Sequence, residues 1–225
     1  MGETTAREIS VADDQQSWWR RLQVRLRKKR FAFFVSLLST LPRPLSILDV
    51  GGTPEFWQTM EFCDRDVTII VYNLTRIETS YPGLVSMAGD ARSMREFADQ
   101  QFDVVFSNSV IEHVGSYEQQ HAMAQEIQRV GKRYYVQTPN RSFPIEPHVL
   151  LPLFQFLPHG LQVFILSHFR SPWGWKIDNS QEAEIYIQAI RLLTAKELHA
   201  FFPKAQMYRE KVWGLTKSFM MCEGW

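Results

Sequence analysis

The chain has 225 residues, of which 45% are hydrophobic and 22% charged, a composition typical of a folded globular protein and not of a disordered one. Its 25 basic and 24 acidic residues give a formal net charge of +1, which excludes a strongly basic nucleic-acid-coating protein. The two cysteines, Cys63 and Cys222, are far apart and outside any C-x-x-C pair, which excludes a disulfide scaffold and a thiolate zinc site and favours a reduced pair.

The near-neutral total hides an uneven distribution of charge. Residues 20–30 hold seven basic residues and no acid, which leaves 18 basic and 24 acidic residues, a net charge of −6, in the rest of the chain. Apolar residues recur at helical spacing over 17–40, so we predict a basic helical cap within residues 1–44. A solvated helix face is the simplest interpretation; the alternatives are a cover over an active site, peripheral contact with an anionic membrane, or contact with a second subunit.

The beginning of the chain indicates no membrane anchor. Its longest strongly apolar run, residues 31–38, is eight residues long, whereas a spanning helix needs about 20. A secretory signal is a poor fit because four acidic residues precede the basic stretch. We therefore expect a cytoplasmic protein.

Strand and helix patterns alternate from residue 45 onward. Short β-rich runs occur at 45–50, 67–72, 84–88, 102–107 and 132–138, and helix patterns at 53–62 and 116–130 lie between them. This alternation predicts a Rossmann-like, doubly wound α/β sheet with parallel strands and helices on both faces. Two final runs, 205–213 and 215–222, are close enough to pair as a hairpin, which gives seven strands with the last one antiparallel.

The alternation stops after the fifth strand. Residues 139–183 contain six prolines with apolar patches between them, and we predict an insertion that folds over the carboxyl edge of the sheet. A helix near 183–193 and another that begins at the capping box of Thr194 and Glu197 then resume the pattern. The expected organisation is the cap at 1–44 and one domain at 45–225.

The first motif that suggests chemistry follows the first strand. Asp49 ends the run, Gly51 and Gly52 follow, and Thr53 and Pro54 begin a helix. Glycines let the backbone approach a ligand, and a helix N-terminus favours anionic groups, so this is a nucleotide-type site; a tight strand-to-helix turn is the structural alternative. The pattern is neither G-x-G-x-x-G nor a P-loop.

Two further motifs follow the third and fourth strands. Asp90 and Ala91 come after the third, where a carboxylate can accept a hydrogen bond from an adenine amine. The fourth strand ends in Asn108 and Ser109, with Glu112 and His113 on the next turn. The carboxyl ends of parallel strands meet at one edge of the sheet, which would bring these groups together.

Together, these segments resemble a class I S-adenosylmethionine-dependent methyltransferase of the broad type 11 group, closely over residues 45–142 and in pattern over 190–222. The resemblance implies S-adenosylmethionine as cofactor and S-adenosylhomocysteine as product. The residues that it implies for cofactor binding are Asp49, Gly51 and Gly52 for the methionine part, Asn73 and Leu74 for the ribose, Asp90 and Ala91 for the adenine, and Asn108, Ser109 and His113 at the border of the cleft.

Two departures from the family pattern weaken this implication. Thr53 and Pro54 stand where the family commonly has a third glycine, and Asn73 replaces the usual acid that binds the ribose. A protein that keeps the fold and binds without catalysis is therefore a rival hypothesis.

Residues 138–148, TPNRSFPIEPH, follow the fifth strand and resemble a subset of the family that methylates sugar hydroxyls in cell-surface sugar and polysaccharide synthesis, mannoside O-methyltransferases among them. An alcohol benefits from a general base. We predict that His148 or His113 takes the hydroxyl proton and that Glu146 orients the base or the sugar, although each histidine could instead make a structural hydrogen bond. Glu112, Glu146 and His148 could hold a divalent ion, but the ligand count is too low to predict a metal site.

The expected partner is a small-molecule or oligosaccharide methyl acceptor. The acidic body and the lack of a PPY-type motif after the fourth strand disfavour nucleic-acid methylation. A lipid or quinone acceptor is the main enzymatic alternative, because the insertion is rich in apolar residues. A homodimer is compatible with the same apolar patches.

Overall fold

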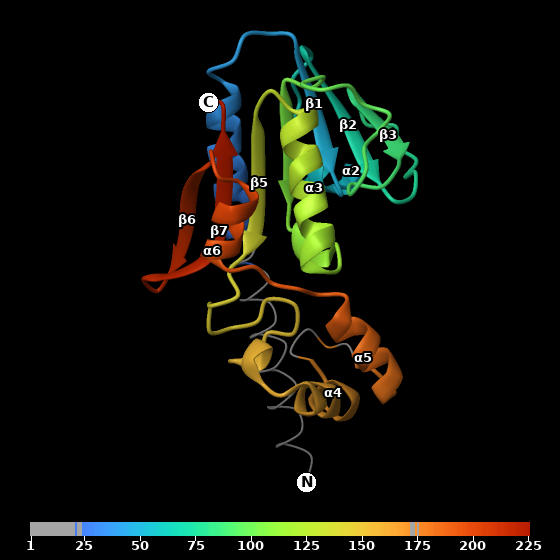
Figure 1. The fold of residues 1–225 in the computed structure, drawn as a ribbon. Coiled ribbons are helices and arrows are strands. Elements are labelled where there is room, and N and C mark those ends of the chain that lie inside the picture. The colour runs from blue at the N-terminus through green and yellow to red at the C-terminus, as the bar shows by residue number, and fades with distance from the viewer. Residues whose placement is uncertain (1–20, 22–23, 172–173, 175) are drawn as a thin grey trace, which may run out of the picture.

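The protein is described by a computed structural model that covers residue 21, residues 24–171, residue 174 and residues 176–225. A single seven-stranded sheet has the order β3-β2-β1-β4-β5-β7-β6 (Figure 1). Its strands are β1 (Leu45–Val50), β2 (Val67–Asn73), β3 (Leu84–Ala88), β4 (Val104–Asn108), β5 (Tyr134–Pro139), β6 (Gln206–Val212) and β7 (Leu215–Glu223). The first five strands pair in parallel, and β7 pairs antiparallel with both β5 and β6. The predicted Rossmann-like α/β sheet is therefore confirmed.

The helical elements are α2 (Pro54–Thr59), η1 (Ile111–His113), α3 (Tyr117–Val130), η2 (Phe154–Phe156), α4 (His159–His168), α5 (Ser180–Gln188) and α6 (Ala195–Phe201). Capping boxes begin α3 and α6 as the sequence predicts. Helix α2 ends three residues earlier than expected, and Glu61 just beyond it has a left-handed backbone with φ of 53°, which cannot continue a helix. Helix α5 begins earlier than expected because the Asn179 side chain caps it by accepting from the backbone N–H of Glu182.

A separate apolar core covers each face of the sheet. On one face, Met123 and Ile127 of α3 and Leu198 of α6 pack against the strands. On the other face lie α2 and the described part of the N-terminal helix, residues 24–38, which contributes Phe31 and Phe34.

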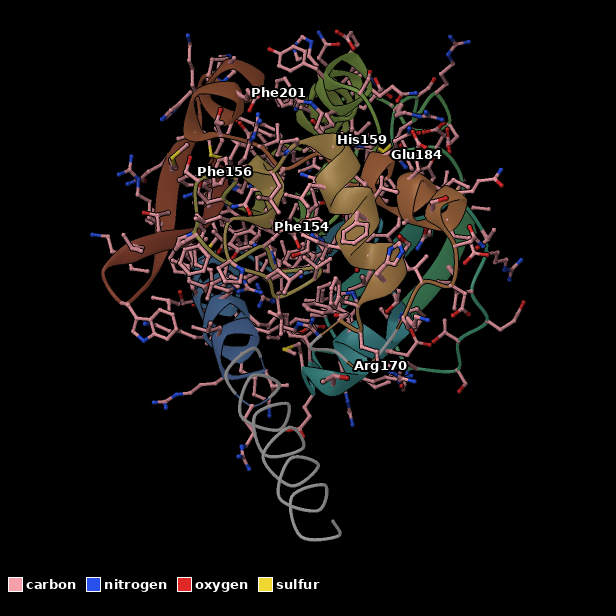
Figure 2. All side chains as sticks on the ribbon, turned by 90° about the horizontal axis from the view of Figure 1, so that it is seen from below. Phe154, Phe156, His159, Arg170, Glu184 and Phe201 are labelled. Carbon is pink, nitrogen blue, oxygen red and sulfur yellow. The ribbon has the colours of Figure 1, made fainter. Side chains whose placement is uncertain are left out.

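The insertion lies at the edge of the sheet where β5 ends, and it carries α4 and α5 (Figure 1). The two helices pack on each other around a small core of their own. Seen from below, α4 lies across the end of the molecule, and His159 of α4 points toward Glu184 of α5 (Figure 2), with Nε2 3.4 Å from Oε1. The insertion thus lies beyond the end of β5.

The basic segment is only partly solvated. Arg25, Lys28 and Lys29 are exposed, but Arg30 is buried and pairs with Glu210 of β6 at 2.9 Å. Residues 1–20, 22 and 23 of the predicted cap lie outside the described part of the chain. Within the described residues, no helix is both long enough and apolar enough to cross a bilayer. Both cysteines are free.

Candidate functional site

A cavity of about 430 Å³ opens at the carboxyl edge of the sheet, beside the ends of β1 and β2. Seven of the predicted cofactor residues line it: Gly51, Asn73, Leu74, Asp90, Ala91, Ser109 and His113. Its other lining residues are Tyr72, Gly89, Arg92, Val110, Val114, Gly115 and Gln119. The described residues of the N-terminal helix do not contribute to this lining.

Two glycines keep the cavity open, because the residues beside them lie too close to accommodate a side chain at either position. Gly51 has φ of +76°, and a Cβ atom there would lie 2.3 Å from Val110. A Cβ atom on Gly89 would lie 2.0 Å from the Tyr72 hydroxyl. A side chain at either position would displace a residue of the cavity wall, so both turns require glycine.

Asp49, Gly52 and Asn108 do not line the cavity. The carboxylate of Asp49 is turned into the core, where Oδ2 accepts a hydrogen bond from Nε1 of Trp57 at 2.7 Å. Burial raises the pKa of Asp49 to about 7, although the bond from Trp57 lowers it. A Cβ atom on Gly52 would lie 1.8 Å from the same carboxylate. Asp49 and Gly52 therefore shape the turn from behind and do not form its ligand-facing surface.

Asn73 and Asp90 both line the cavity, but other protein groups engage their polar atoms. Nδ2 of Asn73 donates to the carbonyl of Gly52 at 3.1 Å, and its Oδ1 accepts from the N–H of Leu74 at 2.8 Å. Arg92 binds both carboxylate oxygens of Asp90, at 2.6 Å in the shortest contact. This bond lowers the pKa of Asp90, which is therefore ionised at neutral pH.

A buried glutamate organises the turn after β5. Oε2 of Glu146 accepts from the backbone N–H groups of His148 and Val149, at 2.7 and 2.8 Å. Oε1 lies 2.6 Å from Nδ1 of His148. Because a carboxylate accepts, this contact assigns the Nδ1 proton to His148 and leaves Nε2 without it in the neutral ring. Burial lowers the pKa of His148, but the bond and charge of Glu146 and the charge of Glu112 raise it above its usual value overall.

The histidine of the cavity wall lies against this pair. The rings of His113 and His148 meet edge to face with centroids 4.9 Å apart. Burial and the nearby His148 lower the pKa of His113. Glu112 is fully buried beside them, and burial raises its pKa to about 7. All three residues predicted for catalysis, His113, Glu146 and His148, are thus brought together by η1 and the insertion.

The groups that could bind a metal differ from the set considered from sequence. Single donor atoms of Glu112, His113 and His148 all lie within 4.8 Å of one another. His113 takes the place of Glu146, because Glu146 is committed to the other ring nitrogen of His148.

A second cavity, of about 320 Å³, lies between the insertion and the residues that follow it, and Glu146 is part of its lining. Its lining combines polar side chains with an apolar wall: Arg141, Glu146, Val149, Phe154, Gln155, Gln162, Tyr186, Ile187, Ile190, Arg191 and Leu192. Sequence reasoning did not identify this cavity, since its walls come from two separate segments, 141–162 and 186–192. For Tyr72 and Arg92, which were also missed, the available signal was their position next to Asn73 and Asp90.

Comparison with known proteins gives a family match over part of the chain. Residues 61–134 match the model of a methyltransferase domain family. No curated protein matches the chain by sequence.

Solved structures share the fold at low identity. A carbon methyltransferase, CurJ, has a TM-score of 0.52 at 12% identity; the match covers 87% of this chain and 53% of CurJ, so the chain spans about half of that length. A S-adenosylmethionine-dependent methyltransferase from Methanosarcina mazei has a TM-score of 0.51 at 14% identity, with 83% and 94% covered. A protein described as a Zn-dependent alcohol dehydrogenase from Rhodobacter sphaeroides has a TM-score of 0.50 at 12% identity, with 82% and 85% covered. The chain therefore has the α/β fold of S-adenosylmethionine-dependent methyltransferases, with a methyltransferase-domain sequence pattern over residues 61–134.

Proposed function

We propose that the protein is an S-adenosylmethionine-dependent O-methyltransferase that acts on a hydroxyl of a sugar or polysaccharide precursor. The observation that carries this proposal is that His148 contacts one lining residue of each of two cavities. His113 lines the first cavity, Glu146 lines the second, and His148 contacts both residues. A donor in one cavity and an acceptor in the other would meet at these side chains.

The first cavity suits the cofactor that the fold implies. Its volume of about 430 Å³ is in the usual range for small-molecule sites. The close approaches at Gly51 and Gly89 leave backbone exposed to a ligand, and Asp90 offers an ionised carboxylate. S-adenosylmethionine bound there supplies an electrophilic methyl group on its sulfonium.

The histidine pair supplies the base. Glu146 fixes the His148 ring through Nδ1, which leaves Nε2 to accept the proton of an acceptor hydroxyl. Pro147 separates the two residues, and the fixed backbone there limits how far the pair can move. Such positioning aligns the hydroxyl for an in-line attack and is worth more than the proton transfer alone.

The second cavity supports a polar acceptor. Glu146, Gln155 and Tyr186 can exchange hydrogen bonds with hydroxyl groups, while Phe154 and Ile187 offer apolar walls to a ring. In addition, Oε1 of Gln155 is buried without a hydrogen-bond partner among the described residues. An acceptor that offers no donor to this oxygen would leave it without a partner, at a cost of about 1–3 kcal/mol.

Two measurements test the proposal in sequence. Calorimetric titration with S-adenosylmethionine and S-adenosylhomocysteine should show binding at one site, and absence of binding by both would refute the methyltransferase function. An acceptor screen should then compare mannosides and sugar phosphates with lipid phenols and quinones. Methylation of the lipid phenols alone would exclude the sugar assignment and retain the methyltransferase.

His148→Ala tests the base directly. We expect kcat to fall by roughly 10²–10⁴-fold, because general-base assistance is lost, while the dissociation constant of S-adenosylmethionine changes by less than about threefold. His159→Ala is a matched control, since His159 also faces a glutamate in the insertion, at 3.4 Å, but its side chain is 52% exposed whereas that of His148 is 18% exposed. Full turnover in the His148 variant would remove it as the base.

A further inference from the structure

We infer that Glu112, His113 and His148 form a binding site for a divalent transition-metal ion such as Zn²⁺. One donor atom of each lies within 4.8 Å of the other two. Two imidazoles and one carboxylate form a common ligand set for zinc and other transition metals that keep open coordination positions. The inference does not depend on the proposed methyl transfer, because it concerns binding of the ion alone.

The carboxylate ligand is free to bind. Glu112 is fully buried, and its Oε1 has no hydrogen-bond partner among the described residues. A buried carboxylate oxygen without a partner is costly unless a cation or donor completes it. A metal ion beside the two imidazoles would satisfy this oxygen.

Each ligand is also held from behind. Glu146 binds Nδ1 of His148 at 2.6 Å, the backbone of Ala189 hydrogen-bonds His113, and the Thr138 hydroxyl donates to Oε2 of Glu112 at 2.9 Å. Metal-binding histidines usually donate their other N–H to a carboxylate or a carbonyl, which fixes the tautomer and orients the ring. All three ligands here have such support.

The site has an open side and requires a modest contraction. His113 is exposed and lines the first cavity, so an ion can enter from there and keep a coordination position toward it. Ligands about 2.1 Å from a tetrahedral zinc lie about 3.4 Å apart, and the donor atoms here are within 4.8 Å of one another, so no separation would have to close by more than about 1.4 Å.

The ion and the proton would compete for the same nitrogen. When Nε2 of His148 coordinates metal it cannot act as the base, and the ion would then lower the pKa of a hydroxyl bound beside it. His148 would therefore act as the base only in the metal-free protein, and the ion would activate the hydroxyl only in the metal-loaded protein. Mg²⁺ and Ca²⁺ prefer oxygen ligands, so this site with its two imidazoles should favour a transition metal over them.

The test is titration of the full chain, freed of metal by chelation, with Co²⁺ followed by absorption and with Zn²⁺ followed by calorimetry. We expect one ion per chain, d–d bands of a four- or five-coordinate Co²⁺ site, and no comparable affinity for Mg²⁺. His113→Ala should weaken binding more than 100-fold, and Glu146→Gln, which alters the support of His148 without removing a ligand, about 10–100-fold.

Matched variants keep the test decisive. Glu112 is buried, so any effect of Glu112→Gln on folding would be mixed with its effect on binding. The exposed His113 therefore carries the main comparison, with circular dichroism as the check on folding. His159→Ala should leave affinity and stoichiometry unchanged. Absence of binding, or binding that His113→Ala leaves within threefold of the wild-type affinity, would overturn the site.

Discussion

Glu146 shows how much one side chain can organise. Its two oxygens accept from two backbone N–H groups and from the His148 ring, so a single carboxylate both shapes the turn and selects the tautomer of the neighbouring histidine. The sequence motif made Glu146 and His148 candidates, but a separation of two residues in the chain does not require their side chains to be in contact. The partnership arises because the turn folds back on the carboxylate.

Glu146→Gln should move the pH dependence of turnover. The bond and charge of Glu146 raise the pKa of His148, so their removal lowers it and the base stays neutral to lower pH. We expect the acidic limb of the kcat profile to shift to lower pH, together with about a tenfold lower maximum because the ring is less well oriented. Profiles of both proteins from pH 5 to 9 check this, and an unmoved limb would contradict the role of Glu146.

Gly51→Ala should impair the cofactor cavity. The new Cβ atom would lie 2.3 Å from Val110 and would occupy a left-handed backbone conformation with φ of +76°. We expect affinity for S-adenosylmethionine to fall at least tenfold, as measured by calorimetry. Gly160→Ala is the control, since nothing lies within 4 Å of a Cβ atom at that position of α4. Wild-type affinity in the Gly51 variant would mean that the turn relaxes freely.

At the scale of elements, the strands were the most predictable parts. The runs at 45–50 and 84–88 have the bounds of β1 and β3, because short apolar stretches closed by turn residues have few alternatives. The insertion was identified only as a break in the pattern. Its helices and second cavity depend on contacts between segments such as 141–155 and 186–192, which periodicity does not encode.

The N-terminal helix and β6 are connected by a buried charge cluster. Arg30 pairs with Glu210 at 2.9 Å, and Lys217 and Ser218 approach the same carboxylate, at 3.5 and 3.0 Å. The carboxylate of Glu210 thus compensates two cations, of which Arg30 is 180 residues away in the sequence. Burial, together with Arg30, lowers the pKa of Lys217, while Glu210 opposes this effect.

Removal of this carboxylate should destabilise the protein. Glu210→Gln leaves two buried cations without a counter-charge, and we expect the free energy of unfolding to fall by about 3–5 kcal/mol. The double variant Arg30→Met, Glu210→Gln should lose less than the single one, because one cation is gone. Urea denaturation of all the variants checks the order, and additive losses would contradict a coupled cluster.

At the scale of the molecule, the two faces of the sheet have different tasks. The core under α3 and α6 continues into η1 and the first cavity, while the core under the N-terminal helix lies on the opposite face. Phe34, fully buried in this second core, packs against Phe106 and Tyr135 with ring centroids 4.5 and 5.2 Å away. Stability contributed by this face should therefore separate from ligand binding.

Phe34→Ala should lower the free energy of unfolding by about 3–5 kcal/mol through loss of aromatic packing, as measured in urea. Affinity for S-adenosylmethionine, measured where the variant is folded, should change by less than threefold. Val24→Ala on the exposed side of the same helix should cost less than about 0.5 kcal/mol. A large loss of affinity with Phe34→Ala would indicate that the two faces are coupled.

The two cavities come from consecutive, non-overlapping stretches of chain: 51–119 supplies one and 141–192 the other. Under the proposed function, donor recognition and acceptor recognition can therefore diverge independently in evolution, since mutations that reshape the second stretch leave the walls of the first unchanged. The same separation makes the segment between β5 and α6 a natural unit for exchange among related enzymes. A chimera that receives this unit should inherit a new acceptor preference while it keeps its affinity for the methyl donor.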